Sequence, residues 1–183
     1  MTRRHREKLE LTDNIYFITT TVANFENILA VDENFTMIVI NSLKYLLAEH
    51  SSSLFAYVIM PNHIHLIIDM PVNESISDFM RDFKKYTAKE IFKKSVIKEN
   101  ITLIDKLKEN SNTGGAKLWM DRFDCELIVT GKFLKQKINY IHNNPVKAGL
   151  VDEITKWPYS SARNYFLDNK TLIEVSTDWE RKI

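Results

Sequence analysis

The sequence predicts an α+β fold, a ferredoxin-like split β-α-β sandwich in which helices cover one antiparallel sheet. Segments rich in β-branched and aromatic residues alternate with segments whose apolar residues recur at helical spacing, in the order β-α-β-β-α-β-α. A Pro61-Asn62 turn signal joins the second and third strands and indicates a hairpin. The 183 residues suit one core. We therefore expect a single domain over residues 1–183, with one helix appended towards the C-terminus.

The strands and helices are predicted from local patterns. Asp32 or Asn34 can cap the first helix, and Ser75 or Ser77 the second. We expect the third helix to close before Pro145, because proline disfavours helical backbone at the preceding residue. The expected strands are residues 14–22, 54–60, 63–70 and 125–129, and the expected helices are residues 35–47, 75–94 and 131–143.

Three segments lie outside these elements. Residues 1–13 form a basic arm. Residues 95–117 are polar and rich in lysine, and we interpret them as a mobile, variable insertion in which residues 101–107 can form a short helix. Residues 152–183 form a C-terminal tail, and residues 157–165 within it predict an irregular cover over one edge of the sheet.

Composition limits the classes of function. The net charge of +1 neither indicates nor excludes a nucleic-acid partner, so any electrostatic footprint has to be local. Cys125 is the only cysteine, which excludes an intramolecular disulfide. No apolar run approaches the roughly 20 residues of a membrane span, and no signal-type stretch follows the basic N-terminus. We expect a cytoplasmic protein with no membrane partner.

His63 and His65 are the first candidates for chemistry. They flank Ile64 in a predicted strand, so their side chains project from one face while Ile64 and Leu66 face the other way. Two imidazoles on one face can offer nitrogens to a single cation. Ordinary core or surface histidines show the same spacing, and the pair by itself does not separate the two interpretations.

Tyr140 and Asn144 are the second candidate pair. They are four residues apart and share one helix face, while Leu134, Ile138 and Ile141 lie on the packing side. A phenol can attack a phosphodiester that a metal polarises, and the amide oxygen can complete the metal ligands. A tyrosine on a helix is more often a packing residue. Tyr86, on the second predicted helix, is the alternative nucleophile.

Three motifs combine these candidates. They are Met-Pro-Asn-His-Ile-His at residues 60–65, Tyr-Ile-His-Asn-Asn-Pro-Val-Lys-Ala-Gly-Leu-Val at residues 140–151, and the tail segment at residues 157–165. Together they resemble the HUH-type single-tyrosine transposases (transposase IS200-like), and most closely the REP-associated tyrosine transposases. The resemblance extends over residues 14–165.

The resemblance implies a role for each candidate. His63 and His65 match the metal ligands, Tyr140 the nucleophile on an appended catalytic helix, and Asn144 the residue that assists metal binding. The implied cofactor is a divalent metal, Mg²⁺ or Mn²⁺. Family members cut single-stranded DNA beside hairpin-forming palindromes, form a 5′-phosphotyrosine link and rejoin the strand elsewhere. Asn144 replaces the glutamine common in insertion-sequence relatives, which suits the REP-associated branch. Either a monomer or a homodimer is compatible with the resemblance, and we favour the monomer.

Basic residues supply the DNA-binding candidates. Arg3, Arg4 and Arg6 form an arm that can reach a groove or phosphates, and Lys84 and Lys85 lie on the second predicted helix. Lysines on a helix are usually only a solvated face, so the arm is the stronger prediction.

Two other classes of function remain open at this stage. One is a domesticated protein that binds hairpin DNA or RNA without cutting it, against which the intact set of His63, His65 and Tyr140 argues. The other is a metal-dependent nuclease that uses water. A Tyr140→Phe variant separates the classes, because only a tyrosine transferase loses cleavage.

Overall fold

The structure, a computed structural model, describes residues 13–111, 115–167 and 171–179. The strands are β1 (Asp13–Thr21), β2 (Ser53–Ile59), β3 (His63–Pro71) and β4 (Asp124–Leu127). The helices are α1 (Glu33–Glu49), α2 (Ile76–Ile97), α3 (Ile101–Glu109), α4 (Gly131–Lys147) and α5 (Ala162–Phe166), with short 3₁₀ turns η1 (Ala23–Phe25) and η2 (Ile154–Lys156).

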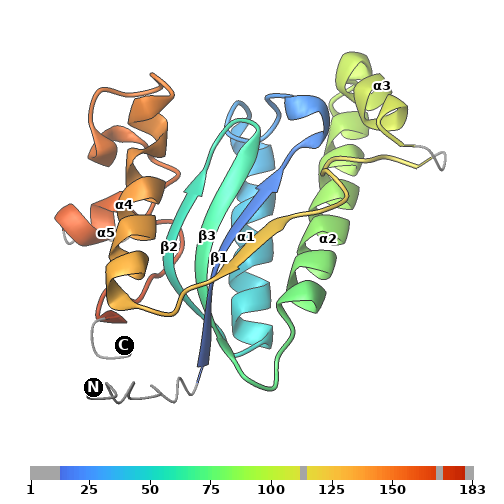
Figure 1. The fold of residues 1–183 in the computed structure, drawn as a ribbon. Helices are drawn as coiled ribbons and strands as arrows, with labels where there is room; N and C mark the ends of the chain where they lie inside the picture. Colours follow the sequence, from blue (N-terminus) through green and yellow to red (C-terminus); the bar gives the residue numbers. More distant parts are fainter. Residues whose placement is uncertain (1–12, 112–114, 168–170, 180–183) are drawn as a thin grey trace, which may run out of the picture.

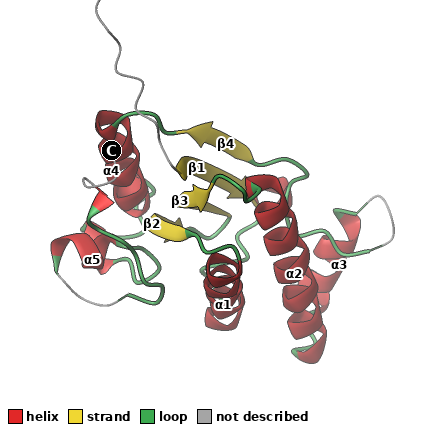
Figure 2. Ribbon diagram, turned by 90° about the horizontal axis from the view of Figure 1, so that it is seen from below, coloured by secondary structure: helices red, strands yellow, loops and turns green. Residues whose placement is uncertain are grey.

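One antiparallel sheet with the strand order β2-β3-β1-β4 organises these elements. Helices α1 and α2 cover one face of the sheet, and α4 lies on the other side (Figures 1 and 2). The order is that of a split β-α-β sandwich, because each crossover leaves room for one strand between the two that it joins. The predicted fold class and the appended helix are both confirmed.

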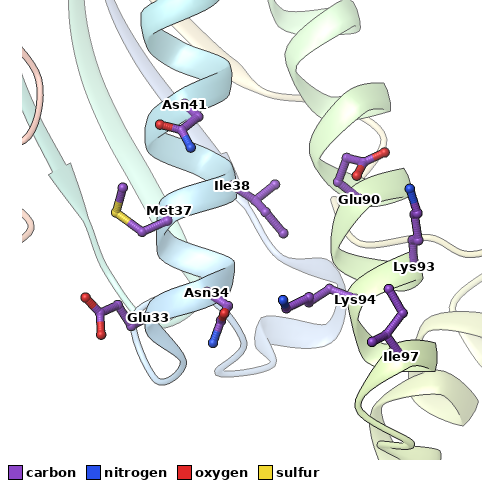
Figure 3. A pocket seen from close by; sticks show the side chains of 9 residues that line it. All are labelled: Glu33, Asn34, Met37, Ile38, Asn41, Glu90, Lys93, Lys94 and Ile97. Atoms are coloured by element: carbon purple, nitrogen blue, oxygen red, sulfur yellow. The ribbon is translucent and has the colours of Figure 1, made fainter.

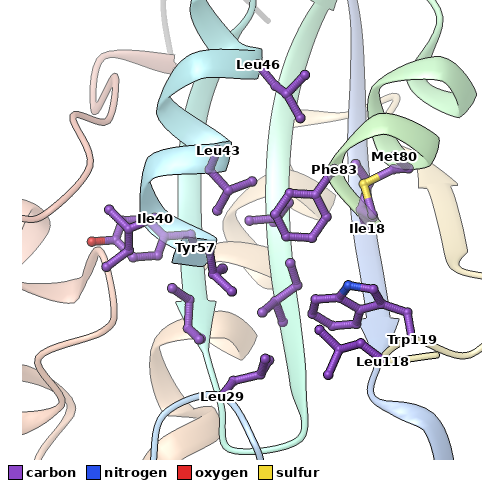
Figure 4. Close-up of a cluster of buried hydrophobic side chains, with 14 of the residues drawn as sticks. Ile18, Leu29, Ile40, Leu43, Leu46, Tyr57, Met80, Phe83, Leu118 and Trp119 are labelled. Carbon is purple, nitrogen blue, oxygen red and sulfur yellow. The ribbon is translucent and has the colours of Figure 1, made fainter. Parts of the chain in front are cut away.

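Each face of the sheet has its own core. Ile64, Leu66 and Ile68 of β3 join the larger core under α1 and α2, whereas Ile67 joins the smaller core under α4. Figure 4 shows part of the larger core, with Leu43 of α1 and Phe83 of α2 packed against the sheet. The strict alternation along β3 therefore places His63 and His65 on the α4 face, as the sequence predicted.

The predicted caps of the first two helices are also found. The Asp32 side chain accepts a hydrogen bond from the backbone N–H of Asn34 at the start of α1, and the Ser75 hydroxyl accepts one from Asp78 at the start of α2. Such bonds satisfy backbone donors that have no partner within the helix.

The short helix expected within residues 101–107 is confirmed, whereas the predicted end of the second helix at residue 94 is wrong. Helix α2 continues to Ile97, and a further helix, α3, follows after one turn. The side chains of Leu103 and Leu107 in α3 are buried in the larger core. An amphipathic face thus stabilises a segment whose composition is typical of a loop.

Two predicted boundaries near α4 are also wrong. The helix does not close before Pro145 but runs through it to Lys147. The proline ring is buried, and its carbonyl accepts a hydrogen bond from Leu150, so packing offsets the missing N–H donor. Strand β4 ends at Leu127 rather than at residue 129, and Ile128, which follows it, is buried in the core under α4.

The tail covers the β2 edge of the sheet, as expected, but it is not wholly irregular, because residues 162–166 form α5. The N–H of Ile59 donates to the carbonyl of Tyr159 over 2.8 Å, and the indole N–H of Trp157 donates to the carbonyl of Ile59 over 3.0 Å. These bonds occupy groups that an open edge strand would leave unpaired. In the described part of the chain, no helix has both the length and the apolarity to cross a membrane.

Candidate active site

The α4 face of the sheet carries a row of ring and hydroxyl side chains. The register of β1 and β3 places Thr19 opposite His65 and Thr21 opposite His63. Phe17 stacks on His65, with ring centroids 5.5 Å apart and planes inclined by 19°, and the His63 ring meets His65 edge-on at 4.8 Å. His65 is only 4% exposed, so neighbouring side chains rather than solvent fix its ring.

Hydrogen bonds to the Nδ1 atoms hold both imidazoles. The Thr19 hydroxyl oxygen lies 2.8 Å from His65 Nδ1, and the Asn62 amide oxygen lies 2.7 Å from His63 Nδ1. When Nδ1 carries the proton and donates it to these oxygens, Nε2 is left unprotonated and can accept a hydrogen bond. This support of one ring nitrogen while the other is available is typical of metal-binding histidines.

Electrostatics keep the histidine pair neutral. Burial, together with the nearby His63 and Lys137, lowers the pKa of His65 to about 3. Burial also lowers the pKa of His63, against a hydrogen bond with Asn144 that favours the protonated form. Neutral imidazole is the form that binds a cation, so both rings are in a form that could act as ligands at physiological pH.

Helix α4 brings the second candidate pair to the first. The Thr130 hydroxyl caps the helix, and Leu134, Ile138 and Ile141 are buried against the sheet. Tyr140 and Asn144 consequently lie beside β3.

The rings and the amide make direct contacts. The Tyr140 ring is edge-on to His65 with centroids 5.1 Å apart, and the Asn144 amide nitrogen lies 3.1 Å from His65 Nε2. Tyr140 is 41% exposed, so a large substrate has access to its hydroxyl.

Few side chains are placed to hold a divalent cation at this site. In the residues that the structure describes, no three or more His, Cys, Asp or Glu side chains form a metal-binding group. His63, His65 and the Asn144 amide could supply two nitrogens and, after a half-turn of the amide, one oxygen. A set of three leaves coordination positions for substrate oxygens, as catalytic metal sites require.

Tyr86 lies away from this site. It is 51% exposed on α2, beyond the opposite face of the sheet, where it borders a groove between α1 and α2 with Tyr45 and His50. Figure 3 shows the adjoining part of these helices, in which Lys93 and Lys94 line a hollow. The structure thus places Tyr140, and not the alternative Tyr86, beside the histidines.

Lys84 and Lys85, the predicted DNA-binding residues that the structure describes, are not at the site either. The Lys84 amine donates to the carbonyls of Met120 and Asp121 over 2.5 and 2.9 Å, so it ties that segment to α2. Lys85 is exposed on α2 beside the Tyr86 groove. The prediction for Arg3, Arg4 and Arg6 falls outside the described residues.

Four residues at the site were not predicted. Asn62 directly precedes His63, and Lys137 precedes Tyr140 by one helical turn on the same face, so both were within reach of motif and spacing arguments. Phe17 and Thr19 carry no such signal, because their contact with His65 depends on the register of β1 against β3.

A comparison with known protein families matches the part of the chain that contains the two histidines and Tyr140. The family described as "Transposase IS200 like" matches residues 16–144, which include His63, His65, Tyr140 and Asn144, and the chain belongs to this family.

Within the family, the similar curated proteins are REP-associated. The chain is 32% identical over 111 residues to a protein of Haemophilus influenzae that has the provisional name of a REP-associated tyrosine transposase. It is 29% identical over 106 residues to the REP-associated tyrosine transposase of Escherichia coli K12. Each alignment covers 58% of this chain, and they cover 56% and 52% of the two relatives, so the chain matches about half the length of these proteins.

A solved structure confirms the fold. The structure of a REP-associated tyrosine transposase bound to a REP hairpin superposes with a TM-score of 0.65 over 97% of this chain and 93% of that one. The two sequences are 19% identical, so this likeness concerns the fold alone.

Proposed function

We propose that this protein is a metal-dependent single-stranded DNA endonuclease and strand transferase that acts at hairpin-forming sequences through a 5′-phosphotyrosine intermediate. The observation that carries the proposal is the contact of a solvent-accessible Tyr140 with the buried, neutral His65, with Asn144 one turn further along α4. Family membership and the names of the relatives support a transposase.

The metal site consists of His63, His65 and Asn144, and the cofactor is Mg²⁺ or Mn²⁺. When bound, this cation polarises the phosphodiester and offsets the negative charge that develops during the reaction. The chain itself orients the ligands through Thr19 and Asn62, which hold the Nδ1 side of each ring.

Tyr140 performs the bond exchange. Its hydroxyl oxygen forms a bond to phosphorus while the bond from phosphorus to the 3′-oxygen breaks, the phenol proton passes to solvent, and the departing 3′-oxygen takes up a proton. The phosphotyrosine conserves the energy of the broken bond. Attack by a 3′-hydroxyl at another site then reverses the exchange and frees Tyr140. Phe17 and His65 hold the ring during both steps.

The proposed partner is single-stranded DNA that carries a hairpin, by analogy with the relative that was solved with a REP hairpin. We assign hairpin contacts to Arg3, Arg4 and Arg6 of the basic arm. Of a monomer and a homodimer, we favour the monomer as the active form.

Adduct formation tests the proposal. The protein is incubated with Mn²⁺ or Mg²⁺ and single-stranded oligonucleotides from the DNA that flanks its gene, and a denaturing gel reveals any covalent protein–DNA product. We expect an adduct that disappears with chelator and with Tyr140→Phe and persists with the matched control Tyr86→Phe. Cleavage that survives Tyr140→Phe would point to a water-using nuclease, and binding without any adduct under both metals to a non-cleaving protein.

A further inference from the structure

Two lysines lie on the face of α4 that carries Tyr140. Each helical residue turns the chain by about 100°, so positions 137, 140, 144 and 147 fall on one side. Lys137 precedes Tyr140 by about one turn, and Lys147 follows it by about two. Between the two lysines α4 rises by about 15 Å, with Tyr140 in the interval. Neither lysine has a role in the bond exchange proposed above.

Aromatic rings hold Lys137 beside the histidines. Its amine lies 4.1 Å from the centroid of the Phe17 ring and 5.0 Å from that of Phe133. Because Phe17 itself stacks on His65, the cation is fixed next to the candidate metal site. Cation–π contacts of this kind orient a charge without neutralising it.

Glu126 of β4 is the carboxylate partner of Lys137. The Glu126 Oε2 atom lies 2.6 Å from the Lys137 amine, and the Glu126 side chain is 52% exposed. An ion pair with one half-exposed member is weak, because solvent screens it. A DNA phosphate that approaches from solvent can therefore replace the carboxylate on the amine.

Lys147 borders the phenol from the other side. Its side chain is exposed, and its amine lies 5.8 Å from the centroid of the Tyr140 ring. A strand laid along α4 with one phosphate at the Tyr140 hydroxyl would therefore meet a cation in both directions.

We propose that Lys137 and Lys147 bind the two backbone phosphates that flank the phosphodiester attacked by Tyr140, and that Glu126 occupies Lys137 in the DNA-free protein. The inference rests on the proposed function, because that function lays the strand across Tyr140. The two lysines would form a clamp along α4 that works for either direction of the DNA strand. This clamp would determine which phosphodiester lies at the Tyr140 hydroxyl.

Salt-dependent binding tests the clamp without any chemistry. A fluorescent oligonucleotide with a hairpin and a single-stranded flank, taken from the DNA beside the gene, is titrated with Tyr140→Phe protein in chelator. Adding Lys137→Gln or Lys147→Gln is expected to weaken binding about tenfold at low salt. Each is also expected to reduce the slope of log affinity against log salt by about 0.7, the value for one phosphate contact on a single strand. Lys135→Gln, an exposed lysine on the other side of α4, is the matched control and is expected to change neither quantity.

A second set of variants separates phosphate binding from a structural ion pair. Glu126→Gln is expected to bind DNA as tightly as the parent or more tightly, because it removes a carboxylate from the phosphate position. If the pair mattered only for folding, Glu126→Gln would be as weak as Lys137→Gln. Lys137→Arg is expected to restore the salt slope. In cleavage by otherwise unaltered protein, Lys137→Gln is expected to raise KM for DNA and to leave kcat unchanged, since the contact is equal in ground and transition states.

The outcomes separate this inference from the function on which it rests. Normal binding by the Tyr140→Phe protein, with the salt slope unchanged by both Lys137→Gln and Lys147→Gln, would overturn the clamp alone. Failure of the Tyr140→Phe protein to bind the oligonucleotide would overturn both proposals.

Discussion

The two faces of the sheet are built from the same strands but are packed in different ways. Under α1 and α2 the inward side chains are almost all apolar, as Leu66 and Phe83 illustrate. Under α4 the apolar core occupies one end, and the other end is a row of polar and ring side chains around His65. Alternation along a strand allows this division, because neighbouring residues belong to different faces. One face can thus supply stability while the other retains buried polar groups.

The largest expected effect is the loss of chemistry from the α4 face. His65→Asn removes a proposed metal ligand, and we expect cleavage to slow by about a thousandfold, since metal catalysis contributes several kcal/mol and about 1.4 kcal/mol corresponds to tenfold. Single-turnover adduct formation measures the rate, and thermal unfolding checks the fold. A variant that cleaves normally would remove His65 from the mechanism.

A substitution on the α1 and α2 face should instead reduce stability and leave the chemistry intact. Phe83 is fully buried, and Phe83→Ala is expected to lower the free energy of unfolding by about 3–5 kcal/mol, because it creates a cavity in the larger core. Urea denaturation measures this loss. The fraction that remains folded should form the adduct at the parent rate. If adduct formation by folded Phe83→Ala slowed as much as it does in His65→Asn, the two faces would not be independent.

Acid should weaken the α4 side through His142. This residue is buried between α4 and the tail, with its Nε2 atom 2.9 Å from the Ser161 hydroxyl, and burial lowers its pKa to about 4. The unfolded chain binds more protons between about pH 4 and 6.5, so the stability due to neutral His142 is complete above pH 6.5 and is lost as the pH falls towards 4. The full effect is roughly 3 kcal/mol.

Denaturation at several pH values measures this dependence. The control is His142→Gln, which should be less stable at neutral pH and should show a shallower decline in acid, because one of the buried imidazoles no longer titrates. An equal decline in both proteins would assign the pH dependence to other groups, such as His65.

A smaller effect is expected when the hydrogen bond that holds the His65 ring is removed. Thr19→Val removes the hydroxyl at Nδ1 and should raise the half-saturating Mn²⁺ concentration for cleavage by about ten- to a hundredfold. Thr20→Val is a matched control on the other face. In the described part of the chain the Thr20 hydroxyl is buried without a hydrogen-bond partner, so its loss should leave the metal requirement unchanged and should not reduce stability. Equal shifts in the two variants would contradict a specific role for Thr19.

The smallest expected effect concerns Tyr86. Because it lies on α2, away from the histidines, Tyr86→Phe should change adduct formation by no more than about twofold, as is usual for an exposed position. The single-turnover assay used for His65→Asn measures it. A loss comparable to that of Tyr140→Phe would make Tyr86 the nucleophile.

Local patterns determined much of this protein in advance. The alternation along residues 63–70 placed both histidines on one face, and the spacing along residues 131–144 separated the packing side of α4 from Tyr140 and Asn144. The caps at Asp32 and Ser75 followed from residue type. These predictions held because strand and helix periodicity are set within a few residues.

Only the tertiary structure decided which local patterns meet. The contact of Thr19 and Phe17 with His65 depends on strand register, and the choice between Tyr140 and Tyr86 depends on which helix covers which face of the sheet. Packing also kept α4 helical through Pro145 and carried α2 to Ile97, beyond its predicted end at residue 94. Each of these outcomes depends on burial against residues distant in the chain, and a local pattern carries no information about those partners.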